Sequence, residues 1–274
     1  MERFAKQLFI LLILILAISG ISYGIYSIYH EEPTCFDDIQ NQGEEGVDCG
    51  IACGKLCAPE IQTLSVEFSK LLKIGNNKYD FVAQISNPNL VYASRRISYD
   101  ILFKDSKDNI FATQPGTIYI LPMQKRYVVH TGLSVEQEPV QAELVIKGVE
   151  WWKVKAGEFS SIDFKLRNEQ YSPSEGNNAF YRAVLFNDSE FDFARVDIRV
   201  ILFDDNNYIV AINRTDARTF LSFTERYFQV TWPHKISVVN PRIVVEATTN
   251  VFEEGNLIRQ YGDREKFQQF YEKY

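Results

Sequence analysis

All of the cysteines in the chain lie in one short acidic stretch, where they can form disulfides or bind a metal: Cys35, Cys49, Cys53 and Cys57. Zinc sites use paired short spacings, whereas Cys49, Cys53 and Cys57 are each four residues apart. Histidine, the other common zinc ligand, is scarce, with 3 in the chain. The sequence therefore predicts two disulfides, although it cannot choose among the alternative pairings.

Oxygen ligands of the kind that calcium prefers lie between these cysteines. The candidate calcium ligands are Asp37, Asn41, Glu44 and Asp48. Their spacing is not that of an EF-hand, although Gly43 offers a tight turn. The alternative, which we favour, is a solvated acidic loop whose charges keep the segment soluble.

The stretch CFDDIQNQGEEGVDCGIACGKLC also resembles a small cysteine-rich module of exported bacterial surface proteins. The resemblance covers about residues 35–57. The chain departs from the module at Asp38 and Ile51, where glycine is common, and carries an extra residue between Cys53 and Cys57. The resemblance implies a surface location and says little about activity.

An uncharged apolar run, Leu8–Ile28, precedes the cysteines. As a helix it would be roughly 30 Å long, which is enough to cross a bilayer. Arg3 and Lys6 precede the run, and basic residues favour the cytoplasmic side of a membrane. We therefore predict a single-pass anchor in the cell membrane, with a cytoplasmic N-terminus and the bulk of the chain outside. Disulfides fit this location, because they persist in oxidising compartments.

The same segment permits two further interpretations. The first is a signal peptide with its apolar region at Leu8–Ala17, but the apolar run continues well beyond Ser19. The second is a homodimer contact, because Gly20 and Gly24 form a G-x-x-x-G that permits close helix packing.

Residues beyond about Thr63 follow the two-residue period of strands with one buried face. One alternating set is Tyr79, Phe81, Ala83 and Ile85, and others are Ile97, Tyr99, Ile101 and Phe103, and Ala142, Leu144 and Ile146. Turn residues such as those at 87–89 and 105–109 separate the runs. The pattern predicts an all-β fold.

Three short motifs then recur with residue numbers that differ by 100. They are the strand that ends at Asn87 and Asn187, the ILF motif that begins at Ile101 and Ile201, and the Arg-Tyr pair at Arg126 and Arg226. We interpret them as a duplicated domain and predict two tandem immunoglobulin-like β-sandwiches. The predicted parts are an anchor at 1–30, a disulfide segment at 31–60, sandwiches at 61–156 and 157–261, and a charged aromatic tail at 262–274.

The strand that ends in asparagine, followed by ILFKD or ILFDD, resembles the extracytoplasmic FxLYD-type domain. The segment ISNPN is similar to part of the late-embryogenesis-abundant group 2 β-sandwich domains. The resemblance covers most of both repeats and implies an envelope-associated, non-catalytic module. It supplies no functional residues.

The repeated polar residues are interpreted as structural. Asn87 and Asn187 suit turns at strand ends, and Asp105 and Asp205 begin polar hairpin turns. Both repeated arginines, Arg126 and Arg226, are expected on exposed strand faces.

Neither catalysis nor nucleic-acid binding is indicated. The chain has no nucleophile elbow, phosphate-binding glycine loop or H-E-x-x-H motif, and the repeat places His130 and His234 in different domains. A formal net charge of -7 without a basic stripe is unsuited to nucleic acid.

The remaining candidates concern partners. Trp151 and Trp152 end the first repeat, where one ring can pack in the interdomain joint or contact a partner or glycan. In the tail, Phe267, Phe270 and Tyr271 would share one face of a short helix. We predict a non-catalytic interaction or scaffold protein with envelope protein partners. The alternative is a surface ligand-binding or adhesion module.

Overall fold

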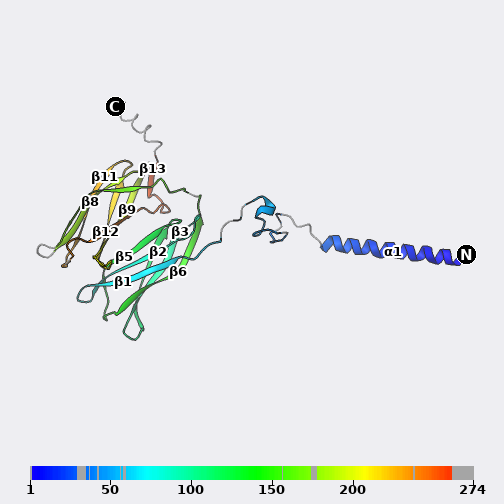
Figure 1. Ribbon diagram of the computed structural model, residues 1–274, viewed down its shortest axis with the longest axis horizontal. Coiled ribbons are helices and arrows are strands. Elements are labelled where there is room, and N and C mark those ends of the chain that lie inside the picture. The colour runs from blue at the N-terminus through cyan, green and yellow to red at the C-terminus, as the bar shows by residue number, and fades with distance from the viewer. Residues whose placement is uncertain are drawn as a thin grey trace, which may run out of the picture. The chain divides into compact units, whose positions relative to one another are not determined.

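The structure is a computed structural model that describes residues 2–29, 35–36, 38–41, 43–55, 57, 60–155, 157–173, 178–236 and 238–260 (Figure 1). The predicted ligand Asp37 and the predicted aromatic tail at 262–274 lie outside the described residues. The chain divides into two compact units, Met1–Glu60 and Ile61–Tyr274.

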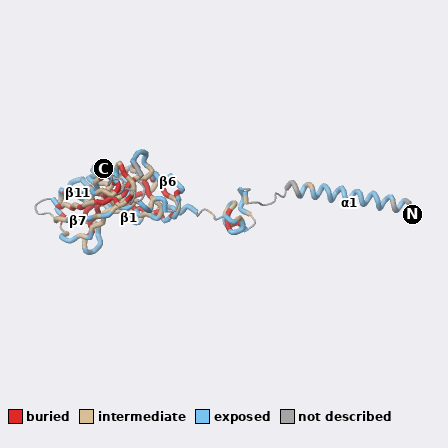
Figure 2. The backbone as a smooth tube through the Cα atoms, turned by 90° about the horizontal axis from the view of Figure 1, so that it is seen from above, coloured by how far each residue is buried: buried red, intermediate tan, exposed pale blue. Residues whose placement is uncertain are grey.

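The N-terminal helix α1 spans Glu2–Tyr29. Its segment Lys6–Tyr26 is long and apolar enough to cross a membrane, a test that a signal sequence also meets. Its described side chains are almost all exposed, which suits a helix surrounded by lipid (Figure 2). A Cβ at Gly20 or Gly24 would meet no atom within 4 Å, so the proposed dimer contact stays a prediction.

Two disulfides hold the cysteine segment, and they join Cys35 to Cys53 and Cys49 to Cys57. None of the four sulfurs is free, so none can act as a zinc thiolate. Regular structure among the described residues of the segment is limited to one turn of 3-10 helix, Ile51–Cys53, and two isolated β-bridges. The disulfide prediction is therefore confirmed, and the pairing is now assigned.

Antiparallel strands make up the second unit, which confirms the all-β sandwich prediction. Its first half contains β1 (Ser65–Gly75), β2 (Lys78–Ser86), β3 (Tyr92–Lys104), β4 (Ile110–Ile120), β5 (Lys125–Ser134) and β6 (Gln141–Lys153). They form two sheets with the strand orders β1-β2-β5 and β4-β3-β6. The predicted alternation places Phe81, Ile97 and Ile101 in the core between the sheets.

The second half contains β7 (Phe164–Ser172), β8 (Ala179–Asn187), β9 (Phe191–Phe203), β10 (Ile209–Phe220), β11 (Glu225–Trp232), β12 (Arg242–Thr248) and β13 (Leu257–Gln260). Its sheets have the orders β11-β8-β7 and β10-β9-β12, and β13 also pairs with β9. Each strand order repeats that of the first half with the strand number raised by six. Trp232, 1% exposed, fills this second core and donates its indole N–H to the Ile212 carbonyl at 2.7 Å.

The repeated asparagines tie neighbouring turns together. Asn87 donates from Nδ2 to the carbonyls of Tyr92 and Leu121, at 2.8 and 2.9 Å. Asn187 does the same with Phe191 and Leu221, at 2.8 and 3.1 Å. Both asparagines are buried, so each side chain satisfies backbone groups that water cannot reach.

The loop that follows the asparagine is one residue shorter in the second half, and this shifts the register of β9. Ile101 lies in the first core, but Ile201 faces outward and Val200 occupies the second core. The two ILF motifs are therefore identical in sequence but do not occupy equivalent positions in the two halves. A shift of one residue reverses the face of every side chain in a strand. The hairpin turn shifts with them: the counterpart of Asp105 is Asp204, not Asp205, since each accepts two backbone N–H bonds through Oδ1.

Gly116 of β4 is required by the close approach of Tyr99 of β3, which lies opposite it. A Cβ at Gly116 would lie 2.4 Å from Tyr99 Oη. We expect Gly116→Ala to lower the free energy of unfolding by about 1–3 kcal/mol through overpacking. The control is Gly148→Ala in β6, where a Cβ would meet nothing within 4 Å. Urea denaturation would contradict this account if both variants were equally stable.

Candidate functional site: the joint between the sandwiches

Apolar side chains join the two halves of the second unit. Val82 and Val129, on the outer face of β2 and β5, form one buried cluster with Ile201, Phe203 and Ile212 of β9 and β10. Burying each such side chain stabilises by about 1.5–3 kcal/mol. The halves are therefore packed as neighbours along these strands, which differs from two domains on a flexible linker.

The sequence of β9 explains this joint. The run Val200-Ile-Leu-Phe203 is buried throughout because Val200 and Leu202 face the second core while Ile201 and Phe203 face the first half. An uninterrupted apolar run is typical of a strand that is buried on both faces.

Arg126 of β5 lies inside the joint, so the prediction that it sits on an exposed strand face is wrong. The residue is 0% exposed. Its guanidinium donates from Nη1 to the Tyr119 carbonyl at 2.7 Å and from Nη2 to Thr248 Oγ1 of the second half at 2.9 Å. It also lies 3.7 Å from the centroid of the Tyr119 ring. Burial lowers the pKa of Arg126 by penalising its charged form.

The counterpart in the second half is Arg226, which keeps the corresponding carbonyl contact but is not covered by the other half. It is half-buried and donates from Nη2 to the Thr219 carbonyl at 2.8 Å. The difference between the two arginines thus comes from the joint and not from the repeat.

Glu246 of β12 completes the polar part of the joint. One of its oxygens accepts the Tyr127 backbone N–H at 3.0 Å, and the other accepts from Arg199 Nη1 at 3.1 Å. β5 is the outer strand of its sheet, so this N–H lacks a neighbouring strand. Burial raises the pKa of Glu246, an effect that the charges of Arg199 and Arg126 oppose.

A pocket of about 340 Å³ opens beside this network. Five arginines from β3, β5 and β9 line it: Arg95, Arg96, Arg126, Arg195 and Arg199. The carboxylates in its lining are Asp197 and Glu253. Sequence reasoning missed the pocket, although its signal was available: arginines cluster at 95–96 in β3 and at 195–199 in β9, which are corresponding strands.

His130 of the first half and His234 of the second each lie near a charged residue of the other half. His130 Nε2 is 2.9 Å from Tyr99 Oη. Burial lowers the pKa of His130, and the charge of Arg214 from the second half lowers it a little more. Burial raises the pKa of Asp80 in the first half. The Gly132 backbone N–H and the nearby His234 of the second half partly oppose this shift. Burial also raises the pKa of Tyr99 to about 12, so at neutral pH the phenol keeps its proton.

The depressed pKa of His130 predicts a loss of stability in acid. The unfolded chain binds a proton near pH 6.5, whereas folding favours the neutral ring, so the stabilisation is complete above about pH 6.5 and is lost as the pH falls through the lower folded pKa. We expect the free energy of unfolding to fall between about pH 7.5 and 5.5, and to fall less in His130→Gln. His30→Gln, which precedes both sandwiches in sequence, should behave as wild type in denaturant titrations at the two pH values.

In the cysteine segment, the described candidate calcium ligands serve as backbone acceptors. Glu44 is 8% exposed, and its Oε2 accepts the Asp48 N–H at 3.0 Å. Asp48 Oδ2 in turn accepts the Asp38 N–H at 3.0 Å. The Asn41 carbonyl accepts the Glu44 N–H at 2.9 Å. These contacts give Glu44 and Asp48 a structural role, and calcium binding stays a hypothesis.

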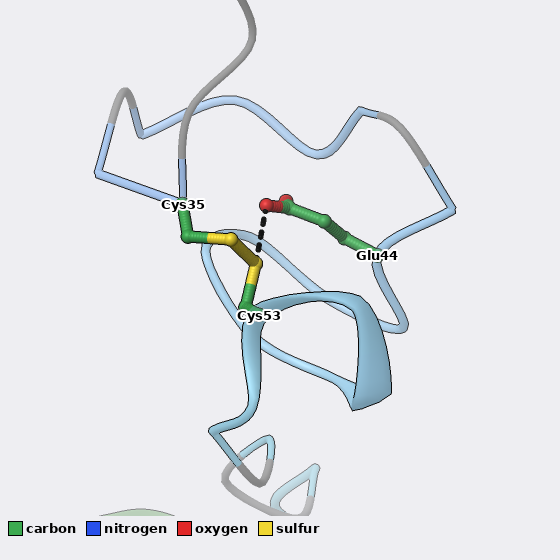
Figure 3. Close-up of side chains that lie close together, drawn as sticks. All are labelled: Cys35, Glu44 and Cys53. Atoms are coloured by element: carbon green, nitrogen blue, oxygen red, sulfur yellow. Dashed lines mark hydrogen bonds between the residues drawn. A yellow bond between two sulfur atoms is a disulfide. The ribbon is translucent and has the colours of Figure 1, made fainter.

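Glu44 also points at the Cys35–Cys53 disulfide (Figure 3). Its Oε1 lies 2.9 Å from Cys53 Sγ. A disulfide sulfur has no proton to donate and is not a thiolate, so this group of three is a packing contact and not a metal site.

The two candidate partner-binding tryptophans lie at the end of β6. Trp152 is 50% exposed, and the Arg95 guanidinium lies 5.4 Å from its ring centroid. Trp151 is opposite Ser94 of β3. The apolar cluster recorded at the joint does not include either ring, so partner contact remains a prediction for both.

Comparisons with known proteins add little. No family model matches the chain, and no curated protein matches it. A solved structure of the calcium binding domain CBD12 of CALX1.1 is similar at 12% identity, over 70% of this chain and 79% of that one, with a TM-score of 0.20. So low a TM-score supports no argument about fold or calcium, and the FxLYD-type resemblance stays a prediction.

Proposed function

We propose that the chain is a membrane-anchored, extracytoplasmic interaction protein of the cell envelope, without catalytic activity. The observation that carries the proposal is the joint, in which the buried cluster around Ile201 and the bonds of Arg126 and Glu246 combine two sandwiches into one unit. Such a unit presents a surface built from both halves, which suits recognition of another protein.

The anchor and the disulfides support the location. α1 is compatible with a membrane span, and two disulfides fit an oxidising compartment. Arg3 and Lys6 favour a cytoplasmic N-terminus, which would place both sandwiches outside.

The test is chemical crosslinking on intact cells, followed by detergent extraction and mass spectrometry of what co-purifies. We expect a reproducible set of envelope proteins with wild type and with Arg226→Met, and a smaller set with Arg126→Met, which weakens the joint. Recovery of the chain alone, or only as its own dimer, would count against the proposal.

A second candidate, a surface module that binds glycan, is favoured by one observation. The exposed Trp152 ring lies beside Arg95, and an indole with a neighbouring guanidinium suits stacking on a sugar. Loss of glycan binding in Trp152→Ala, with envelope partners retained, would support this candidate.

A further inference from the structure

We propose that the arginine-lined pocket at the joint binds a phosphate group. The proposal does not depend on the protein partners, since it concerns a small ligand.

Charge is the first reason. Five guanidinium groups line the pocket against the two carboxylates of Asp197 and Glu253, in a chain whose formal net charge is -7. Three of the arginines have ion pairs: Arg95 with Glu150 at 3.1 Å, Arg195 with Asp197 at 2.8 Å, and Arg199 with Glu246 at 3.1 Å. Arg96 and Arg126 have none recorded in the described part of the chain.

The burial of Arg126 is the second reason. A buried cation without a carboxylate partner is costly, and Arg126 is 0% exposed with an Nε that has no hydrogen-bond partner. Its bonds go to a carbonyl and a hydroxyl and not to a carboxylate, so Glu246 and Asp197 offset its charge only from a distance. An anion in the adjoining pocket would supply the compensation from outside, without direct contact to Nε.

The arrangement of the donors selects the class of anion. The arginines come from three strands, β3, β5 and β9, so their guanidinium groups reach the pocket from different parts of the joint. A carboxylate carries one charge and pairs with a single guanidinium in its plane. A phosphate monoester carries about -1.5 to -2 at neutral pH and offers three oxygens in different directions, which fits several guanidinium groups at once.

Isothermal titration calorimetry on the full chain in neutral detergent, with inorganic pyrophosphate as the probe, tests the proposal. We expect binding that weakens with added salt. Arg96→Gln and Arg195→Gln, both at exposed residues, should each raise Kd about tenfold, as for loss of one charge-assisted contact. Arg218→Gln is the matched control, because this arginine of β10 is exposed, pairs with Asp216 and lies outside the pocket lining.

Two further probes refine the result. Citrate tests the anion class, and tighter binding of citrate than of pyrophosphate would overturn the phosphate assignment. Dibutyroyl phosphatidic acid tests the source: competition with pyrophosphate would support a lipid headgroup, and binding of pyrophosphate alone would support a soluble phosphate. Absence of heat at millimolar pyrophosphate with a folded chain, or an equal loss in Arg218→Gln, would overturn the site.

Discussion

Replacing Arg126 with methionine is expected to lower the free energy of unfolding of the two-sandwich unit by about 2–3 kcal/mol. Methionine fills part of the space but leaves the Tyr119 carbonyl and Thr248 Oγ1 without the guanidinium donors at 2.7 and 2.9 Å. Glu246, buried nearby, loses a favourable charge. The relief of the desolvated cation offsets part of this loss, which keeps the net effect below the sum of the contacts.

Arg226→Met is the matched control, since Arg226 donates to the corresponding carbonyl, that of Thr219, without cover from the other half. Because it is half-buried, its loss should be under about 1 kcal/mol in urea denaturation followed by tryptophan fluorescence. Equal effects of the two substitutions would mean that the joint adds nothing to the role of Arg126.

A double-mutant cycle locates the effect in the joint. Thr248→Val removes the hydroxyl that Arg126 and Arg199 share. If the halves are energetically linked, the effects of Arg126→Met and Thr248→Val should deviate from additivity by at least about 0.5 kcal/mol. Strict additivity would show that the contact between Arg126 and Thr248 is energetically silent.

Local patterns were sufficient to predict the fold class and the first core. Residues such as Phe81, Ile97 and Ile101 alternate with less apolar positions, and strand geometry converts this alternation directly into two faces. The long apolar helix α1 follows in the same way from length and composition.

The joint could not be predicted by matching the repeats. A loop one residue shorter turned Ile201 away from the core position of Ile101, although the ILF letters agree. Letter identity carries no information about which face a side chain takes once the register has shifted. The burial of Arg126 depends on contacts from a distant part of the chain, which its local sequence does not show. The same Arg-Tyr pair occurs at Arg226, which is only half-buried.

The cysteine segment shows a different limit. Oxidising location and cysteine count predict disulfides, but the pairing depends on the path of a chain that has almost no regular structure. The chemistry of Glu44 makes it a candidate calcium ligand, but the sequence does not show that its carboxylate accepts a backbone N–H, because only the folded loop brings the two together.

Removing either disulfide is expected to unfold the cysteine segment and leave the sandwiches intact. The sequence separations are 18 for Cys35–Cys53 and 8 for Cys49–Cys57. Loop-closure entropy gives each bridge roughly 2.5–3 kcal/mol. Burial offers little to replace it, because the buried described residues of the segment are Glu44, Cys49 and Gly50. A segment without its own core depends on such bridges for order.

Hydrogen exchange on the full chain measures this directly. In wild type, the Gly50 N–H bonds to the Lys55 carbonyl at 2.6 Å and the Cys53 N–H to the Gly50 carbonyl at 3.1 Å, so both should be protected. In Cys35→Ser with Cys53→Ser, and in Cys49→Ser with Cys57→Ser, we expect this protection to disappear. Ile51→Ala, at a residue 89% exposed, is the control and should retain it. Tryptophan fluorescence reports both sandwiches, through Trp151 and Trp152 of the first half and the buried Trp232 of the second, and its midpoint in urea should not move, because the residues of both cores lie beyond the cysteine segment. Protection that survives either double substitution would show that hydrogen bonds such as that of Glu44 suffice to order the segment. A shifted fluorescence midpoint would show that the segment stabilises the sandwiches.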